Sequence, residues 1–294
     1  MARLVIDEAF LSQIELLEML IKNNFAGMFG GNRQSKTYGS SCEFADYRDY
    51  MPGDDITKID WNAYARFDKL YQKLYLDERQ MHTRIYIDAS RSMEHGSGKK
   101  AEQALRIAAT VAYLSVCAMD KVSVYAVRDG YVEDVIVGMV GKDSFIGAIG
   151  ALNGMGFYGD SALSQSIVPT NVGRGDGMSV IISDFLTDND YTDAINHLAD
   201  KRRDVLCIQV LSKEEMNPQI RGKMHLFDSE DGTKYYRKNI DRDIARAYRE
   251  ALNYATGKVR ELCASRGADY LLATAEEPVG EIFFEKLVNM GVLK

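Results

Sequence analysis

Residues 84–92 read RIYIDASRS, which joins a short apolar run directly to one carboxylate and two hydroxyls. The apolar run predicts a buried strand, so Asp88, Ser90 and Ser92 follow the point where that strand ends. A second apolar run ends at Asp184 in the same way. Ligands of open α/β sheets bind at the carboxyl edge of the strands, so parallel neighbouring strands would bring both aspartates to one site.

Oxygen donors of this kind suit a hard divalent cation. Magnesium takes six oxygen ligands and gives up its waters reluctantly, so hydroxyls with carboxylates behind bridging waters fit it. We therefore predict Mg²⁺, with Mn²⁺ or Ca²⁺ as alternatives, held so that one more carboxylate from a partner or substrate completes the shell. A second interpretation is local, because Ser and Asp also favour helix starts and could simply cap the following helix. Asp184 after a second strand weakens that interpretation.

From residue 83 onward the apolar pattern alternates between strand and helix. Strands are expected at residues 84–87, 122–127, 132–137, 178–183, 205–211 and 270–272, and helices at 99–119, 144–152, 162–167, 191–201, 241–266 and 281–288. Asp129-Gly130 and Asp231-Gly232 each predict a hairpin turn. Strands that alternate with helices imply crossovers and an α/β fold, with a mostly parallel sheet covered by helices on both faces.

The chain is expected to divide at residue 80. Residues 1–80 would form a segment packed on the core, and residues 81–294 the main domain with a C-terminal hairpin and helices. Within the first part, a helix is expected at 7–23, an exposed glycine-rich loop from Gly27 to Ser41, and short extended pieces over 43–79. The turn Pro52-Gly53-Asp54-Asp55, with Asp60 and Trp61, could bind a partner, but a structural role with a packed Trp61 is expected.

Composition narrows the class of protein. The 294 residues are 46% hydrophobic, which is enough to bury a substantial core. The net charge of -7 disfavours broad electrostatic attachment to nucleic acid or to anionic membrane. Cys42, Cys117, Cys207 and Cys263 match neither a zinc spacing nor a disulfide framework, so reduced thiols are expected. No stretch approaches the roughly 18 apolar residues that a spanning helix needs, and we expect a cytoplasmic protein.

Several motifs resemble known families. The sequence IDASRSM at 87–93, with Ser183-Asp184, resembles the metal-ion-dependent adhesion site of von Willebrand factor A domains. Five upstream motifs resemble the signature of the domain-of-unknown-function family fifty-eight: EF at 43–44, YRDY at 47–50, PGDD at 52–55, IDW at 59–61 and AR at 65–66. The sequence LFDSEDG at 226–232 is similar to an acidic turn late in that family. The resemblance runs from about Phe44 to the C-terminal helix and implies a von Willebrand factor A-like, Rossmann-like fold.

The resemblance also implies three ligand loops and a partner. Asp88, Ser90 and Ser92 match the first loop, and Asp184 matches the last. The middle loop of the family usually offers a threonine after a glycine. Ser161 in Gly159-Asp160-Ser161 is the best match here, although Asp160 could compete for the metal. Thr170 is a poorer match because its neighbours place it in a later turn. Family members are generally associated with MoxR-type AAA+ ATPases, apparently as adaptors.

Two classes of function compete. The first is a noncatalytic module in which the ion binds an acidic side chain of another protein, with Arg91 either orienting that acid or pairing with Glu94. The second is a metal-dependent hydrolase of phosphate esters, with Asp88 as nucleophile or the metal as Lewis acid. Phosphatases with a strand-end aspartate commonly carry a second aspartate two residues on as general acid, and here that position is Ser90. We therefore predict a module and not an enzyme.

Overall fold

The computed structural model describes residues 5–24, 44–75, 81–94, 98–172, 177–218, 222–227, 235–240 and 242–287. These residues form two compact units, of which the smaller comprises residues 44–75. Helix α1 (Glu8–Asn24) belongs to the larger unit, which differs from the expected division at residue 80. The reason is that Phe10, Ile14 and Leu17 of α1 are buried in the core of the larger unit. The packing of the smaller unit on that core stays a prediction, and the loop from Gly27 to Ser41 lies outside the described residues.

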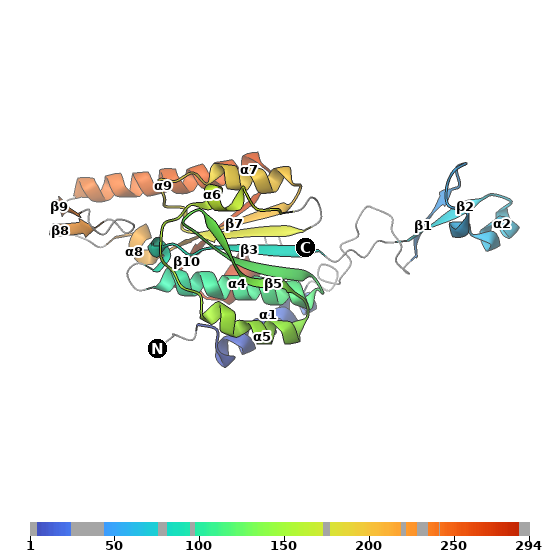
Figure 1. The fold of residues 1–294 in the computed structure, drawn as a ribbon, viewed down its shortest axis with the longest axis horizontal. Coiled ribbons are helices and arrows are strands. Elements are labelled where there is room, and N and C mark those ends of the chain that lie inside the picture. The colour runs from blue at the N-terminus through green and yellow to red at the C-terminus, as the bar shows by residue number, and fades with distance from the viewer. Residues whose placement is uncertain are drawn as a thin grey trace. The chain divides into compact units, whose positions relative to one another are not determined.

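A six-stranded sheet forms the centre of the larger unit (Figure 1). Its strands, in the order β10-β7-β6-β3-β4-β5, are β10 (Asp269–Thr274), β7 (Asp204–Leu211), β6 (Met178–Ser183), β3 (His82–Asp88), β4 (Lys121–Arg128) and β5 (Tyr131–Met139). Five strands are parallel, and β5 pairs antiparallel with β4 at one edge. Asp129 and Gly130 join β4 to β5 with positive φ angles, 49° and 79°, as a tight hairpin turn requires.

Helices cover both faces of this sheet (Figure 1). Helices α1, α4 (Lys99–Cys117) and α5 (Lys142–Asn153) lie on one face, and α6 (Leu163–Ile167), α7 (Thr192–Asp200) and α9 (Arg242–Ser265) on the other. The strands alternate accordingly, since Ile85 and Ile87 pack with the first group and Tyr86 with the second. The predicted α/β class, with a mostly parallel sheet and helices on both faces, is confirmed.

Shorter elements complete the larger unit. They are α3 (Arg91–Glu94), α8 (Lys213–Met216), α10 (Val279–Glu281), the π-helical turn η2 (Ile282–Leu287), and the antiparallel strands β8 (Gly222–Phe227) and β9 (Tyr235–Ile240). The second predicted hairpin is therefore present, although its Asp231-Gly232 turn lies outside the described residues. In the described part of the chain, no helix is long and apolar enough to cross a membrane. Cys117, Cys207 and Cys263 are free thiols, and Cys42 lies outside the described residues.

The smaller unit contains a helix that the sequence analysis missed. Strands β1 (Phe44–Asp49) and β2 (Tyr71–Tyr75) pair antiparallel, but the 3₁₀ turn η1 (Ile56–Lys58) and helix α2 (Trp61–Phe67) lie between them instead of extended chain. Asp60 starts α2, because its side chain accepts hydrogen bonds from the backbone N–H groups of Asn62 and Ala63. The expectation of a packed Trp61 is wrong within the described residues, where this side chain is 62% exposed.

Candidate metal centre at the carboxyl edge of the sheet

The register of two central strands brings the predicted residues together. Parallel strands β3 and β6 are neighbours, and Ile87 is aligned with Ile182. The residues that follow, Asp88 and Ser183, therefore reach the carboxyl edge side by side, and the Ser183 hydroxyl donates a 2.6 Å hydrogen bond to Asp88 Oδ2. Asp184 follows directly, so the expectation that both aspartates meet at one edge is confirmed.

The first loop directs its polar atoms inward. Asp88 and Ser90 are fully buried and Ser92, in the short helix α3, is 6% exposed. Asp88 Oδ1 accepts a hydrogen bond from the Ser90 backbone N–H at 3.1 Å, and the Ser90 and Ser92 hydroxyl oxygens lie 3.1 Å apart. The bond to Ser90 is the local turn that the capping interpretation expects. Among the described residues, however, Asp88 Oδ2 accepts hydrogen bonds from hydroxyls of distant segments, so this residue does more than shape its own loop.

The middle loop contributes Ser161. This buried residue donates its hydroxyl hydrogen to Asp88 Oδ2 at 2.7 Å. Its carbonyl oxygen accepts a 2.6 Å hydrogen bond from the Asn189 side-chain amide, which links the middle loop to the segment after β6. Thr170, the other candidate, instead donates its hydroxyl to the Ile167 carbonyl at 2.6 Å. Of the two candidates, the structure therefore brings Ser161 to Asp88.

Gly159 of the middle loop contacts both the first loop and the β4–β5 turn. The Gly159 carbonyl accepts a 3.0 Å hydrogen bond from the Arg91 backbone N–H. Gly159 has φ +77°, and a Cβ atom there would collide with the Asp129 carboxylate of that turn, so a larger residue would be strained. Asp160 is held by backbone hydrogen bonds to and from Asp129 and is exposed. The Arg91 side chain is also exposed, at the rim of the first loop.

The last loop is held by its own backbone and by strand β7. Asp184 Oδ1 accepts a 3.1 Å hydrogen bond from the Leu186 N–H, and the Asp184 carbonyl accepts one of 2.6 Å from the Gln209 side chain. Phe185 has φ +51°, a left-handed conformation that is uncommon outside glycine. Its N–H donates to the Ser183 hydroxyl oxygen at 2.9 Å, and its ring is buried. This strained turn fixes the direction in which Asp184 leaves the sheet.

The sequence analysis missed a buried lysine at this site. Lys100, in the first turn of α4, places Nζ 2.8 Å from Asp184 Oδ2 and 2.6 Å from Glu215 Oε1. Glu215 is held in turn by a reciprocal capping box with Ser212 at the start of α8. The spacing of Ser212 and Glu215 is a recognisable helix-start signal. No local pattern indicated Lys100, because its partners lie more than 80 residues away along the chain.

The charges at the site are unevenly compensated. Burial raises the pKa of the Asp88 carboxyl, and the neighbouring Asp184 raises it further, while hydrogen bonds from Ser183, Ser90 and Ser161 act in the opposite direction. Burial alone would lower the pKa of Lys100, but the Asp184 and Glu215 carboxylates raise it overall. Asp184 therefore has an ammonium partner, whereas the described contacts of Asp88 are neutral donors.

The donor set fits a hard divalent ion. A hydroxyl has one hydrogen to donate, so Ser161, which gives it to Asp88, keeps its lone pairs for a cation. Ser183 also donates to Asp88, but its oxygen accepts a hydrogen bond from the Phe185 N–H, so it keeps one lone pair where Ser161 keeps two and is the weaker ligand candidate. The described residues contain no group of three or more His, Cys, Asp or Glu side chains placed to share a metal. A cation here would depend on hydroxyls together with Asp88 and Asp184.

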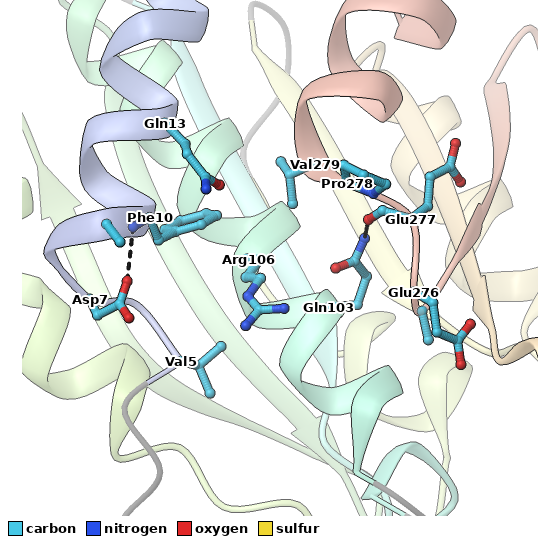
Figure 2. Close-up of a pocket in the computed structure, with 12 residues that line it drawn as sticks. Val5, Asp7, Phe10, Gln13, Gln103, Arg106, Glu276, Glu277, Pro278 and Val279 are labelled. Carbon is cyan, nitrogen blue, oxygen red and sulfur yellow. Dashed lines mark hydrogen bonds between the residues drawn. The ribbon is translucent and has the colours of Figure 1, made fainter.

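A pocket lies elsewhere on the same unit, between α1, the first half of α4 and the segment after β10 (Figure 2). It has a volume of about 370 Å³ and none of the predicted site residues lines it. Figure 2 shows Arg106 near its centre and Phe10 and Val279 on its walls. Glu276 lines it too, and pairs with Lys99 at 3.8 Å, one residue before the lysine of the candidate site.

Several known proteins are similar to this chain. "Uncharacterized protein Rv1480" of Mycobacterium tuberculosis (strain ATCC 25618 / H37Rv) is 25% identical over 233 residues, which cover 77% of this chain and 73% of that protein. An aerotolerance-related membrane protein from Bacteroides fragilis matches with a TM-score of 0.43 and 14% identity, over 71% of this chain and 100% of that one. The SpRpn10 VWA domain matches with a TM-score of 0.39 and 10% identity, over 73% and 97%.

The family comparison covers most of the chain. Residues 46–258 match the family described as "Protein of unknown function DUF58". The match includes the smaller unit from Asp46 onward, all three candidate ligand loops and the first part of α9. The mostly parallel sheet described above is the α/β architecture that the sequence predicted. This chain belongs to the DUF58 family.

Proposed function

We propose that this chain is a noncatalytic, metal-dependent protein-interaction module. A divalent ion, Mg²⁺ in the first instance, binds at the candidate site and in turn binds an acidic side chain of a partner. The observation that supports this most is the environment of Asp88, a buried carboxylate whose described partners are a backbone N–H and serine hydroxyls. A buried anion without a cation is costly, so a bound metal ion would stabilise the site.

The residues have separate roles in this proposal. Ser90, Ser92 and Ser161 supply hydroxyl oxygens, and Asp88 and Asp184 balance the charge of the ion. Hydroxyl ligands leave the ion with residual positive charge, which favours an incoming carboxylate. Arg91, exposed beside the first loop, would orient that carboxylate through a charge-assisted hydrogen bond. The chemistry supplied by the ion is electrostatic binding, with no bond made or broken.

We propose a MoxR-type AAA+ ATPase as the partner and a cytoplasmic location for the complex. The family resemblance supports this choice of partner. The proposal also requires the partner to supply an Asp or Glu carboxylate to the ion, which can be tested. Nucleic acid is not part of the proposal, in keeping with the net charge of -7, and no membrane-embedded segment is proposed. The hydrolase alternative requires a general acid beside the metal loops, and Ser90 stands where such an acid would be expected.

A pull-down from native lysate tests the proposal. The wild type should retain a partner in Mg²⁺, lose it in chelator and bind it again when Mg²⁺ is restored. Asp88→Ala should not retain the partner under any of these conditions. Asp160→Ala is the matched control, because Asp160 neighbours Ser161 but is exposed and has its described hydrogen bonds on the backbone. Partner binding that is unchanged in chelator and in Asp88→Ala would disprove a metal-dependent interaction.

A turnover assay tests the noncatalytic part. Purified protein with Mg²⁺ should not hydrolyse phosphomonoesters, phosphodiesters or nucleoside triphosphates. Contaminating activity is identified by comparing the wild type with Asp88→Ala prepared in parallel. Hydrolysis that is present in the wild type and lost in Asp88→Ala would show that the site is catalytic.

A further inference from the structure

We infer that Lys100 is an internal competitor of the metal ion, a positioning residue that weakens binding of a divalent cation in the absence of an acidic ligand. The inference rests on the proposed function, since it assumes that Asp88 and Asp184 balance the charge of a bound ion. It concerns the second carboxylate of the site, Asp184, whose Oδ2 atom accepts a 2.8 Å hydrogen bond from the Lys100 ammonium.

Two carboxylates hold the Lys100 ammonium in the described part of the chain. Its side chain is 6% exposed, far less than the 50% of the adjacent Lys99. The ammonium lies between Asp184, which is 1% exposed, and Glu215, 28% exposed. Glu215 uses its other oxygen to accept hydrogen bonds from the Ser212 N–H and hydroxyl, at 2.8 and 3.1 Å. Lys100 is therefore held against Asp184 and does not share the freedom of a surface lysine.

The Lys100 ammonium changes the electrostatic environment of a divalent ion that binds near Asp184. Each oxygen of Asp184 already accepts one hydrogen bond, Oδ1 from a backbone N–H and Oδ2 from Lys100, so a metal ion or its bound water that uses Oδ2 must approach beside the ammonium. An arriving cation must share that oxygen with the ammonium and is repelled by it. Like charges at short range disfavour each other, most strongly where water is excluded. The same ammonium attracts an incoming carboxylate, so Lys100 shifts the balance from metal alone toward metal with an acidic ligand.

Substitution of Lys100 tests this directly. Lys100→Met removes the charge and keeps a long side chain, so the dissociation constant for Mn²⁺ alone should fall by about tenfold or more, because a unit charge several ångströms from a divalent ion has an effect of this size even in a water-like medium. Lys99→Met is the matched control, since Lys99 is the neighbouring residue and pairs with Glu276 outside the site. Mn²⁺ binding is measured by electron paramagnetic resonance of the free ion, with no partner protein present.

A second variant covers the case in which Lys100→Met does not fold. Glu215→Gln removes a carboxylate and leaves the ammonium with Asp184 alone, so Mn²⁺ binding should weaken several-fold. Where Lys100→Met folds, tighter Mn²⁺ binding in this variant but not in Lys99→Met supports the inference, and any other result overturns it as long as the wild type binds. Where Lys100→Met does not fold, weaker Mn²⁺ binding in Glu215→Gln supports the inference, and unchanged or tighter binding overturns it. Absence of Mn²⁺ binding in the wild type and in every variant would overturn the proposed metal site, and this inference with it.

Discussion

Asp60 and Asp88 are both buried aspartates that accept several hydrogen bonds, but their surroundings shift their pKa values in opposite directions. Asp60, in the smaller unit, accepts from the Tyr47 hydroxyl at 2.7 Å and from two backbone N–H groups of α2, and lies 3.3 Å from the Lys73 ammonium. These contacts, the Tyr47 hydroxyl foremost, lower its pKa to about 2. Asp88 has a raised pKa, through burial and the adjacent Asp184.

The difference separates a structural carboxylate from one that is suited to a ligand. Asp60 is stable as an anion because helix α2 and Lys73 compensate its charge where it stands. Asp88 is held at the sheet edge by neutral donors and faces a second carboxylate, so ionisation there is costly until a cation binds. The two environments predict opposite responses to metal, to substitution and to pH.

Removal of each carboxylate should have the largest effect. In wild type, Mg²⁺ at a hundred times its dissociation constant should stabilise the folded state by about 2.7 kcal/mol. For a protein of this size, that corresponds to a rise of roughly 5–10 °C in melting temperature. Asp88→Ala should abolish this rise. Asp60→Ala should lower the melting temperature without Mg²⁺ but should show the same rise when Mg²⁺ is added. Differential scanning calorimetry with Mg²⁺ and with chelator measures both, and a full Mg²⁺ response in folded Asp88→Ala would contradict the assignment.

The two serines on Asp88 should then separate ligand from support. Ser161 and Ser183 donate to the same oxygen, at 2.7 and 2.6 Å, but only Ser183 also accepts from a backbone N–H in the described contacts. Ser161→Ala should raise the Mn²⁺ dissociation constant about tenfold, the equivalent of one lost charge-assisted bond of about 1.4 kcal/mol. Ser183→Ala should cost about 1 kcal/mol of stability and leave Mn²⁺ binding within a few-fold of wild type.

Isothermal titration with Mn²⁺ and thermal unfolding give the two readouts for these serine variants. Ser161→Thr is the conservative control, because it keeps the hydroxyl and should retain most of the affinity. If Ser183→Ala weakened Mn²⁺ binding as much as Ser161→Ala, the distinction between ligand and support would fail. If neither substitution changed Mn²⁺ binding, the hydroxyls would not be ligands at all.

The pH dependence of the stability of the metal-free protein should show whether the pKa of Asp88 is raised. A carboxyl with a raised folded-state pKa binds its proton more tightly when folded, so stability falls as pH rises from the ordinary value of 3.8 toward the folded-state pKa. The slope is about 1.4 kcal/mol per pH unit within that window. Asp88→Asn does not titrate and should lack this fall. Chemical unfolding in chelator between pH 4 and 7 measures the difference, and parallel profiles for both proteins would exclude a raised pKa.

The sequence predicted the sheet more fully than the site. Apolar runs end at Asp88 and Asp184, and these local patterns were enough to place the strands, both aspartates and the first-loop serines. Ser161 was chosen over Thr170 by resemblance, and only the 2.7 Å contact with Asp88 shows why. Lys100 could not be predicted, because its role depends on two carboxylates that the fold brings from distant segments.

Helix α2 shows the other limit of the pattern. Its seven residues are too few to display a helical period, and Trp61, Tyr64 and Phe67 include strong strand formers. The determining feature was the cap at Asp60, which offers its carboxylate to two backbone N–H groups at the helix start. An aspartate before a tryptophan is not by itself a signal for a helix. The helix could therefore be recognised only once the contacts of the Asp60 carboxylate were known.

The smallest expected effect concerns Asp60 and completes the contrast with Asp88. A carboxyl with a lowered folded-state pKa contributes stability above its unfolded value of 3.8, and the contribution is lost as pH falls toward the folded-state value of about 2. Tyr47→Phe removes the hydroxyl that lowers this pKa most, so acid unfolding of the smaller unit should begin a few tenths of a pH unit higher. Trp61, the only tryptophan, starts α2 beside Asp60, so its fluorescence reports this unit selectively. Tyr64→Phe, in the same helix, is the control and should leave the acid midpoint unchanged. Equal shifts in both variants would mean that loss of a tyrosine hydroxyl, and not the Asp60 contact, sets the acid limit.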